Sequence, residues 1–293
     1  MRSHNENVLI LQSGHIALAA IVALLATRLA LAASSPPDVR DIMRRSIEAG
    51  DRNSEIERHY AFSNRTEDRE VDANGKVKSI ESKTYEAIFI EGRLVRKLVA
   101  RNDKPLPAEE RNKERDRLNK LSEERKKETA QQREKRLAST RQSREKEKEF
   151  NREILNAFDF RLAGEGRVDG RETWIIEAAP HPGYQPKDLK TQMLAHMKGK
   201  LWVDKQDYGW AKIDAEATDT ISFGFVLARM EKGARFLFEQ TWVNNEVWLP
   251  RSNRIRASAR IGLIKKLQID RETAFQNYRK IQNYRKIDQP AEP

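Results

Sequence analysis

The sequence predicts an α+β fold in which a curved antiparallel sheet forms an open half-barrel covered by helices. Most segments after residue 57 alternate apolar and polar residues with a period of two, which is typical of strands with one buried face. The connections between them are short and rich in Gly, Asn and Asp, as in hairpins. Few segments have a helical period, so two or three helices must cover the apolar face of one sheet.

The first 32 residues have the features of a signal peptide. The apolar run from Ile16 to Thr27 is too short to span a hydrocarbon layer of about 30 Å. Ala30-Leu31-Ala32 then provides an A-x-A cleavage pattern, followed by the helix-breaking Ser34 to Pro37. We expect cleavage near Ala32 and a single domain over residues 33–293. The alternative is an uncleaved N-terminal anchor, and in both cases the body of the chain is exported and periplasmic.

The composition excludes several kinds of chemistry. The chain has no cysteine, which rules out disulfides, thiol chemistry, iron–sulfur clusters, Cys-zinc sites and lipoprotein acylation. Its formal net charge is +11. For an exported chain this charge indicates an anionic membrane surface or cell-wall polymer as partner rather than nucleic acid.

The mature chain is expected to begin with a helix and a three-stranded meander. Proline at the first helical position and apolar residues on one face predict a helix from Asp38 that Gly50 ends. Strands are expected at 57–70, 77–90 and 93–101, joined by turns at Asp72 to Gly75 and at Glu91-Gly92.

Residues 105–150 form a charged insertion in this pattern. From Glu109 to Glu149 there is no Gly and no Pro, and opposite charges lie three or four residues apart, which favours a long helix. Apolar residues are too few for a coiled coil. Two interpretations remain open, a solvated helix without a ligand and a basic arm that contacts an anionic surface.

Alternation resumes after Phe150 and continues nearly to the end. The predicted strands are 158–167, 171–179, 200–204, 210–217, 225–231, 234–243, 247–249 and 254–269. A short helix is expected to contain Met193, Leu194 and Met197, and Pro250 is expected to end its strand. Residues 277–281 and 283–287 are a local duplication.

Three segments carry a family resemblance. Gly170 to Glu177 leading into Pro180, Leu201 to Asp204 before Trp210, and Trp242 to Pro250 resemble the periplasmic outer-membrane lipoprotein-sorting (LolA/LolB-like) superfamily. The resemblance covers residues 38–101 and 158–285. It implies an unclosed barrel whose helix-covered cavity holds acyl chains, in a family that also includes lipid-binding sensors of envelope stress.

No motif predicts catalysis. The histidines of the mature chain, His59, His181 and His196, are scattered, and neither H-E-x-x-H nor G-x-S-x-G occurs. Gly164 to Gly170 lacks the spacing of a dinucleotide-binding loop. We therefore expect no catalytic residue, no metal, no cofactor and no enzymatic activity.

Two sets of residues are candidates for binding. Arg254, Arg256 and Arg260 share one face of a strand and suit an anionic head group, although they could also belong to a solvated outer face paired with acidic residues. The second set is aromatic, and its members either line a hydrophobic ligand cavity or pack in an ordinary core. It comprises Trp202, Trp210, Phe236, Phe238 and Trp248, with Trp242 nearby.

These observations favour a periplasmic binding, carrier or sensor protein for an amphipathic ligand. The ligand would be a lipid or the acyl chain of a lipoprotein, held by apolar contacts with basic residues at its head group. The alternative is a structural or interaction protein of the envelope that uses the charged helix at 109–149 to bind a protein or an anionic partner.

Overall fold

The computed structural model describes residues 37–72, 76–90, 93–223, 228–261 and 265–281. All described residues except Pro37 and Asp38 belong to the compact unit Val39–Pro293. The predicted signal peptide and the second copy of the duplication lie outside the described residues, as do parts of the predicted turns and of the strand at 225–231. No helix within the described ranges is long and apolar enough to cross a membrane.

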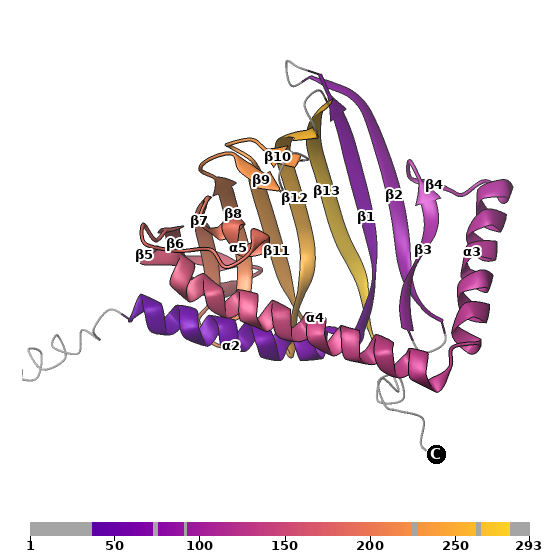
Figure 1. The fold of residues 1–293 in the computed structure, drawn as a ribbon, viewed down its shortest axis with the longest axis horizontal. Helices are drawn as coiled ribbons and strands as arrows, with labels where there is room; N and C mark the ends of the chain where they lie inside the picture. Colours follow the sequence, from indigo (N-terminus) through magenta and orange to yellow (C-terminus); the bar gives the residue numbers. More distant parts are fainter. Residues whose placement is uncertain (1–36, 73–75, 91–92, 224–227, 262–264, 282–293) are drawn as a thin grey trace, which may run out of the picture. The chain divides into compact units, whose positions relative to one another are not determined.

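The described residues of the unit form a large sheet and four helices (Figure 1). The helices are α2 (Val39–Glu57), α3 (Ala108–Lys126), α4 (Ala130–Ala157) and α5 (Leu189–Leu194). The strands are β1 (Tyr60–Val71), β2 (Val77–Ile90), β3 (Arg93–Arg101), β4 (Lys104–Pro105), β5 (Phe158–Val168), β6 (Arg171–Pro180), β7 (Met197–Asp204), β8 (Trp210–Ala217), β9 (Ile221–Phe223), β10 (Ala228–Met230), β11 (Arg235–Val243), β12 (Val247–Ile261) and β13 (Lys265–Lys280).

All thirteen strands belong to one antiparallel sheet. The strand order is β4-β3-β2-β1-β13-β12-β11-β8-β7-β6-β5, and the short strands β9 and β10 extend from β12. The pairing of β1 with β13 brings the first and last described strands together in the middle of the sheet. Among the described strands, the edges β4 and β5 do not pair with each other. The sheet is therefore open, which confirms the predicted half-barrel.

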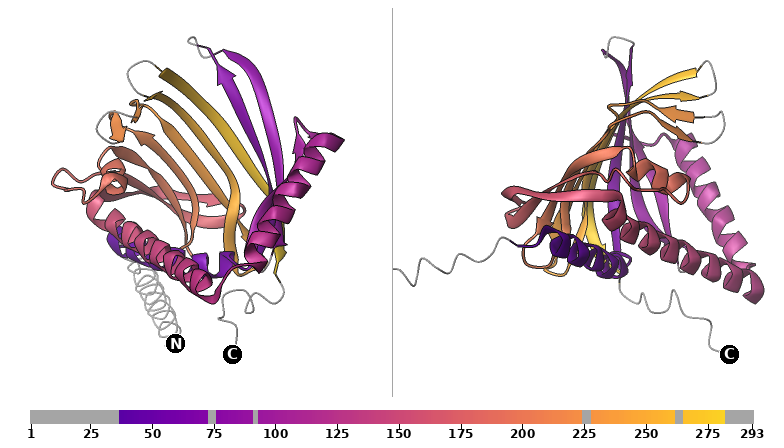
Figure 2. Two further views of the ribbon diagram at one scale, coloured as in Figure 1. Left: turned by 45° about the vertical axis from the view of Figure 1, so that its right-hand side comes forward. Right: turned by 60° about the vertical axis from the view of Figure 1, so that its left-hand side comes forward.

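Helices cover one face of the curved sheet. α2 and α4 run side by side across one end of it, and α3 flanks the edge at β3 (Figures 1 and 2). Ile42 and Met43 of α2 are 3% and 0% exposed and pack with Ile176 and Leu201 of the sheet. Burial of each such side chain contributes about 1.5–3 kcal/mol. This core fixes the helices on the face that we call concave.

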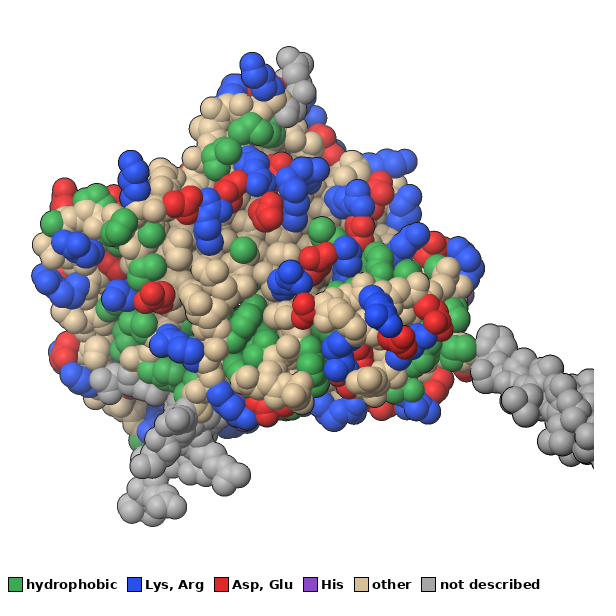
Figure 3. Space-filling model, turned by 180° about the vertical axis from the view of Figure 1, so that it is seen from behind, with side chains coloured by type: hydrophobic (Ala, Val, Ile, Leu, Met, Phe, Trp, Pro, Cys, Tyr) green, Lys and Arg blue, Asp and Glu red, His purple; other side chains and the backbone are tan. Residues whose placement is uncertain are grey.

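The opposite, outward face is charged. Seen from behind, basic and acidic side chains are interspersed across the sheet (Figure 3). Many form cross-strand ion pairs, such as Arg235–Asp214 at 2.6 Å and Lys212–Glu239 at 2.7 Å. Exposed pairs of this kind contribute little stability each, but they make this face a solvated one. Apolar contacts are accordingly concentrated on the concave face.

Two predicted helix boundaries are wrong. Gly50 does not end the first helix, because α2 continues to Glu57, where Ile56 packs against Tyr60. Here tertiary packing outweighs a local stop signal. The charged stretch is not one helix but two, since α3 ends at Lys126 and Thr129 caps α4 in a capping box with Gln132.

Three predicted strand and helix assignments are also wrong. Met197 begins β7 instead of lying in the preceding helix. Pro250 does not end its strand, because it lies opposite Gln240 at a register shift, where a proline is tolerated. The strand expected at 254–269 is divided between β12 and β13, which pair antiparallel with Arg256 opposite Asp270.

Candidate functional site

The concave face is filled at one end and hollow at the other. Over β5 to β8, the side chains of α2, α4 and α5 form the main core. Over β1 to β3, two adjacent hollows remain, of about 480 Å³ and 600 Å³. We call the first the α4 hollow, since it lies between α2, α4 and β1 to β3, and the second the strand hollow, since β1 to β3, β12 and β13 line it. Both are lined by Phe62 of β1, and together they form the groove.

Apolar side chains form the sheet wall of the α4 hollow. Phe89 of β2 and Leu94 of β3 are cross-strand partners. Each is 41% exposed, although Ala87, two residues before Phe89 and on the same face, is buried. Phe62 continues this wall and packs edge-on against Phe275, with ring centroids 5.4 Å apart. Large apolar groups left exposed within a hollow are typical of binding sites.

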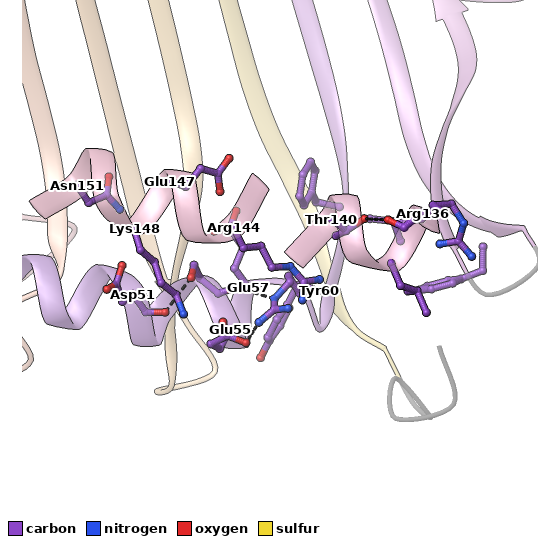
Figure 4. A pocket seen from close by; sticks show the side chains of 16 residues that line it. Asp51, Glu55, Glu57, Tyr60, Arg136, Thr140, Arg144, Glu147, Lys148 and Asn151 are labelled. Carbon is purple, nitrogen blue, oxygen red and sulfur yellow. Dashed lines mark hydrogen bonds and ion pairs between the residues drawn. The ribbon is translucent and has the colours of Figure 1, made fainter. Parts of the chain in front are cut away.

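Charged side chains form the helical wall of the same hollow. Lys148 extends from α4 toward Asp51 and Glu57 of α2, and Arg144 lies near Glu55 and Glu57 (Figure 4). Burial, and next the neighbouring carboxylate of Glu147, raise the pKa of Glu57 above its ordinary value. The α4 hollow thus combines an apolar wall with a charged wall of mixed sign.

The strand hollow is polar. The hydroxyls of Thr66 and Thr273 lie 3.2 Å apart across β1 and β13. Arg271 forms an ion pair with Asp68. The guanidinium of Arg96 lies over the ring of Tyr85, 4.0 Å from the ring centroid. Aromatic and cationic groups therefore meet at this end of the groove.

The structure does not bring the predicted aromatic set together. Trp210 and Phe236 pack against the main core, and alternation along β11 places Phe238 on the same face. Trp202 lies on the outward face, with the ammonium of Lys212 5.2 Å from its ring centroid. Trp248 is 1% exposed, and its indole N–H donates to Asp207. None of the five lines the groove, and a ligand role for them stays a prediction.

The predicted arginine row is paired with nearby acidic residues. Arg254 lies 3.6 Å from Asp270, and Arg256 lies 3.3 Å from the same carboxylate. Arg260 lies 3.8 Å from Glu231. No member of the row lines the groove. Whether the row binds an anion stays a prediction.

Sequence reasoning did not single out the residues of the groove. A local signal existed for Phe89 and Leu94, since they flank a two-residue connection and hairpin pairing places them opposite each other. No local signal shows that they face α4. Within the described ranges, no group of three or more His, Cys, Asp or Glu residues is placed to hold a metal ion.

The comparisons with known proteins give no match to a family model. No curated protein sequence matches either. Solved structures with a similar fold include an outer membrane lipoprotein-sorting protein domain from Vibrio parahaemolyticus, at 9% identity and a TM-score of 0.33 over 84% of this chain and 100% of that one. A LolA superfamily protein from Nitrosomonas europaea has 8% identity and a TM-score of 0.27 over 85% and 95%.

A third similar structure is MucB from Pseudomonas aeruginosa in complex with MucA, at 10% identity and a TM-score of 0.22 over 81% of this chain and 99% of that one. The first two of these similar structures are a lipoprotein-sorting domain and a LolA superfamily protein. At these identities and TM-scores the likeness says nothing about ligand or activity.

Proposed function

We propose that the chain is a periplasmic binding or carrier protein for an amphipathic ligand, a lipid or an acylated protein, and that it acts without catalysis. The observation that supports this best is the exposure of Phe89 and Leu94 inside the α4 hollow. Exposed apolar surface there is unfavourable in water, and an apolar chain that covers it gains about 0.8 kcal/mol per buried CH₂ group.

The size of the groove supports the same proposal. Each hollow falls within the range of about 300–1,000 Å³ that is usual for ligand pockets. Because both hollows share Phe62, an elongated ligand can lie along the two of them. The periplasmic location rests on the signal peptide predicted at residues 1–32.

Native mass spectrometry of the protein purified from the periplasm, followed by organic extraction, tests the proposal. A bound species of lipid mass, or uptake of the neutral fluorophore 1-N-phenylnaphthylamine, is the expected result. A ligand-free mass together with no uptake of the fluorophore or of added phospholipid would overturn it. The interaction-protein alternative, with α3 and α4 as the working surface, would then be favoured.

A further inference from the structure

We propose that the ligand of the groove is anionic, and that Arg96 in the strand hollow binds its phosphate or carboxylate group. This inference rests on the proposed function and narrows the class of ligand. It also places the anionic group on the concave face, away from the arginine row of β12.

Arg96 differs from the other arginines around the groove in its partners. Its side chain is exposed, and among the described residues no carboxylate forms an ion pair with it. Arg271 is paired with Asp68, Arg58 with Glu55 and Arg136 with Glu128. The ring of Tyr85 holds the guanidinium of Arg96 from one side. Stacking on Tyr85 orients the planar guanidinium group but leaves its N–H groups available for a bidentate contact with an oxyanion.

The charges that line the strand hollow favour an anion. Its cationic lining residues are Lys83, Arg96 and Arg271, and its one acidic lining residue is Asp68. Asp68 pairs with Arg271, and Glu81 of β2 pairs with Lys83, which leaves the charge of Arg96 in excess. Asn253 adds a side-chain amide that has no hydrogen-bond partner among the described residues. A net positive hollow with unpaired donors stabilises a phosphate or a carboxylate by charge-assisted hydrogen bonds.

The α4 hollow has no such excess of charge. Its basic and acidic lining residues are equal in number, and its sheet wall is apolar. The two hollows therefore divide the groove into an apolar end and a cationic end. Leu94 and Arg96 are two residues apart on β3, which corresponds to about 7 Å along a strand. A chain that lies over Leu94 thus places its head group beside Arg96.

The outward arginine row is less suited to the same task. Arg254 and Arg256 share the carboxylate of Asp270, and Arg260 lies near Glu231. An anion that binds there has to compete with carboxylates already in place. At Arg96 it meets a cation without a competing carboxylate.

Displacement of 1-N-phenylnaphthylamine by dodecyl phosphate, dodecanoate and dodecanol, each below its critical micelle concentration, tests the inference. The protein is expected to bind both anionic compounds at least about 10-fold more tightly than dodecanol, because a hydrogen bond to a charged group contributes about 1.5–3 kcal/mol. Arg96→Gln should lose about 10- to 100-fold in affinity for the two anions and keep its affinity for dodecanol. The affinity of Arg96→Lys for the two anions should lie between that of the parent protein and that of Arg96→Gln.

Arg256→Gln is the matched control, since it removes an arginine of the outward row, and it should bind all three compounds as the parent does. Unchanged thermal unfolding of each variant verifies the fold. Equal affinities for dodecyl phosphate and dodecanol, or an unaffected Arg96→Gln variant, would overturn the inference while leaving the proposed function standing.

Two further outcomes of the displacement assay have different meanings. If neither the fluorophore nor any dodecyl compound binds, the proposed function itself fails and the inference fails with it. If millimolar inorganic phosphate displaces dodecyl phosphate, the site recognises a free anion rather than the head group of an amphiphile, which would also overturn the inference.

Discussion

Replacing both Phe89 and Leu94 with alanine is expected to weaken apolar ligand binding. Each side chain is 41% exposed. Because full burial of such a side chain contributes about 1.5–3 kcal/mol, a ligand that covers the exposed fraction gains about 0.6–1.2 kcal/mol from each. The double variant should therefore lose about 1.2–2.5 kcal/mol, or roughly 8- to 70-fold in Kd.

The assay is a fluorescence titration with 1-N-phenylnaphthylamine, alongside thermal unfolding of each protein. Ile80→Ala is the matched control, because Ile80 lies on the same strand, is 54% exposed, and by alternation faces away from Phe89. Ile80→Ala should bind as the parent does. An unchanged Kd in the double variant, or an equal loss in Ile80→Ala, would refute the argument that the groove holds the apolar ligand.

Three further predictions concern stability. The raised pKa of Glu57, caused by burial and by Glu147, means that ionisation destabilises the fold above that pKa. Glu57→Gln should therefore raise the Tm at pH 7.5 but not near pH 4, and a Tm gain that is independent of pH would contradict this. Asp204 is fully buried, with both carboxylate oxygens 2.7 Å from Arg171, so Asp204→Asn should cost about 3–5 kcal/mol in urea unfolding at pH 7. Burial opposes its ionisation, but hydrogen bonds from Arg171 and from backbone N–H groups outweigh burial and lower the pKa of Asp204. That stabilisation is present above the ordinary pKa and lost as the pH falls through the lowered one, so the cost should shrink in acid. Thr129→Ala removes the cap of α4 and should cost about 1 kcal/mol, whereas an unchanged unfolding curve would show that the cap adds nothing.

Local pattern was sufficient for much of the fold. The predicted strands 77–90 and 93–101 have the same bounds as β2 and β3, and the strand at 210–217 those of β8. Alternation and turn residues are local properties, so they can be recognised within about ten residues of chain. The local stop signals at Gly50 and Pro250 failed, because packing extends α2 past Gly50 and a register shift accommodates Pro250 within β12.

The candidate site was not predictable in the same way. Trp248 and Phe89 are both aromatic residues on strands, yet Trp248 is 1% exposed and Phe89 is 41% exposed in a hollow. The difference depends on distant parts of the chain: Trp248 bonds to Asn53 of α2, 195 positions away, and to Asp207, whereas Phe89 faces the α4 hollow. A pattern read along one strand does not contain that information.

The sequence by itself determined an antiparallel sheet with one apolar face per strand, a few covering helices, and the absence of thiol chemistry. Only the tertiary structure decided which charges have partners. Arg256 lies opposite Asp270 because β12 and β13 pair in that register, whereas Arg96 lies on Tyr85 and has no carboxylate partner among the described residues. Two arginines on strands look alike in sequence, and they differ because strand register and helix packing bring distant residues beside one and not the other.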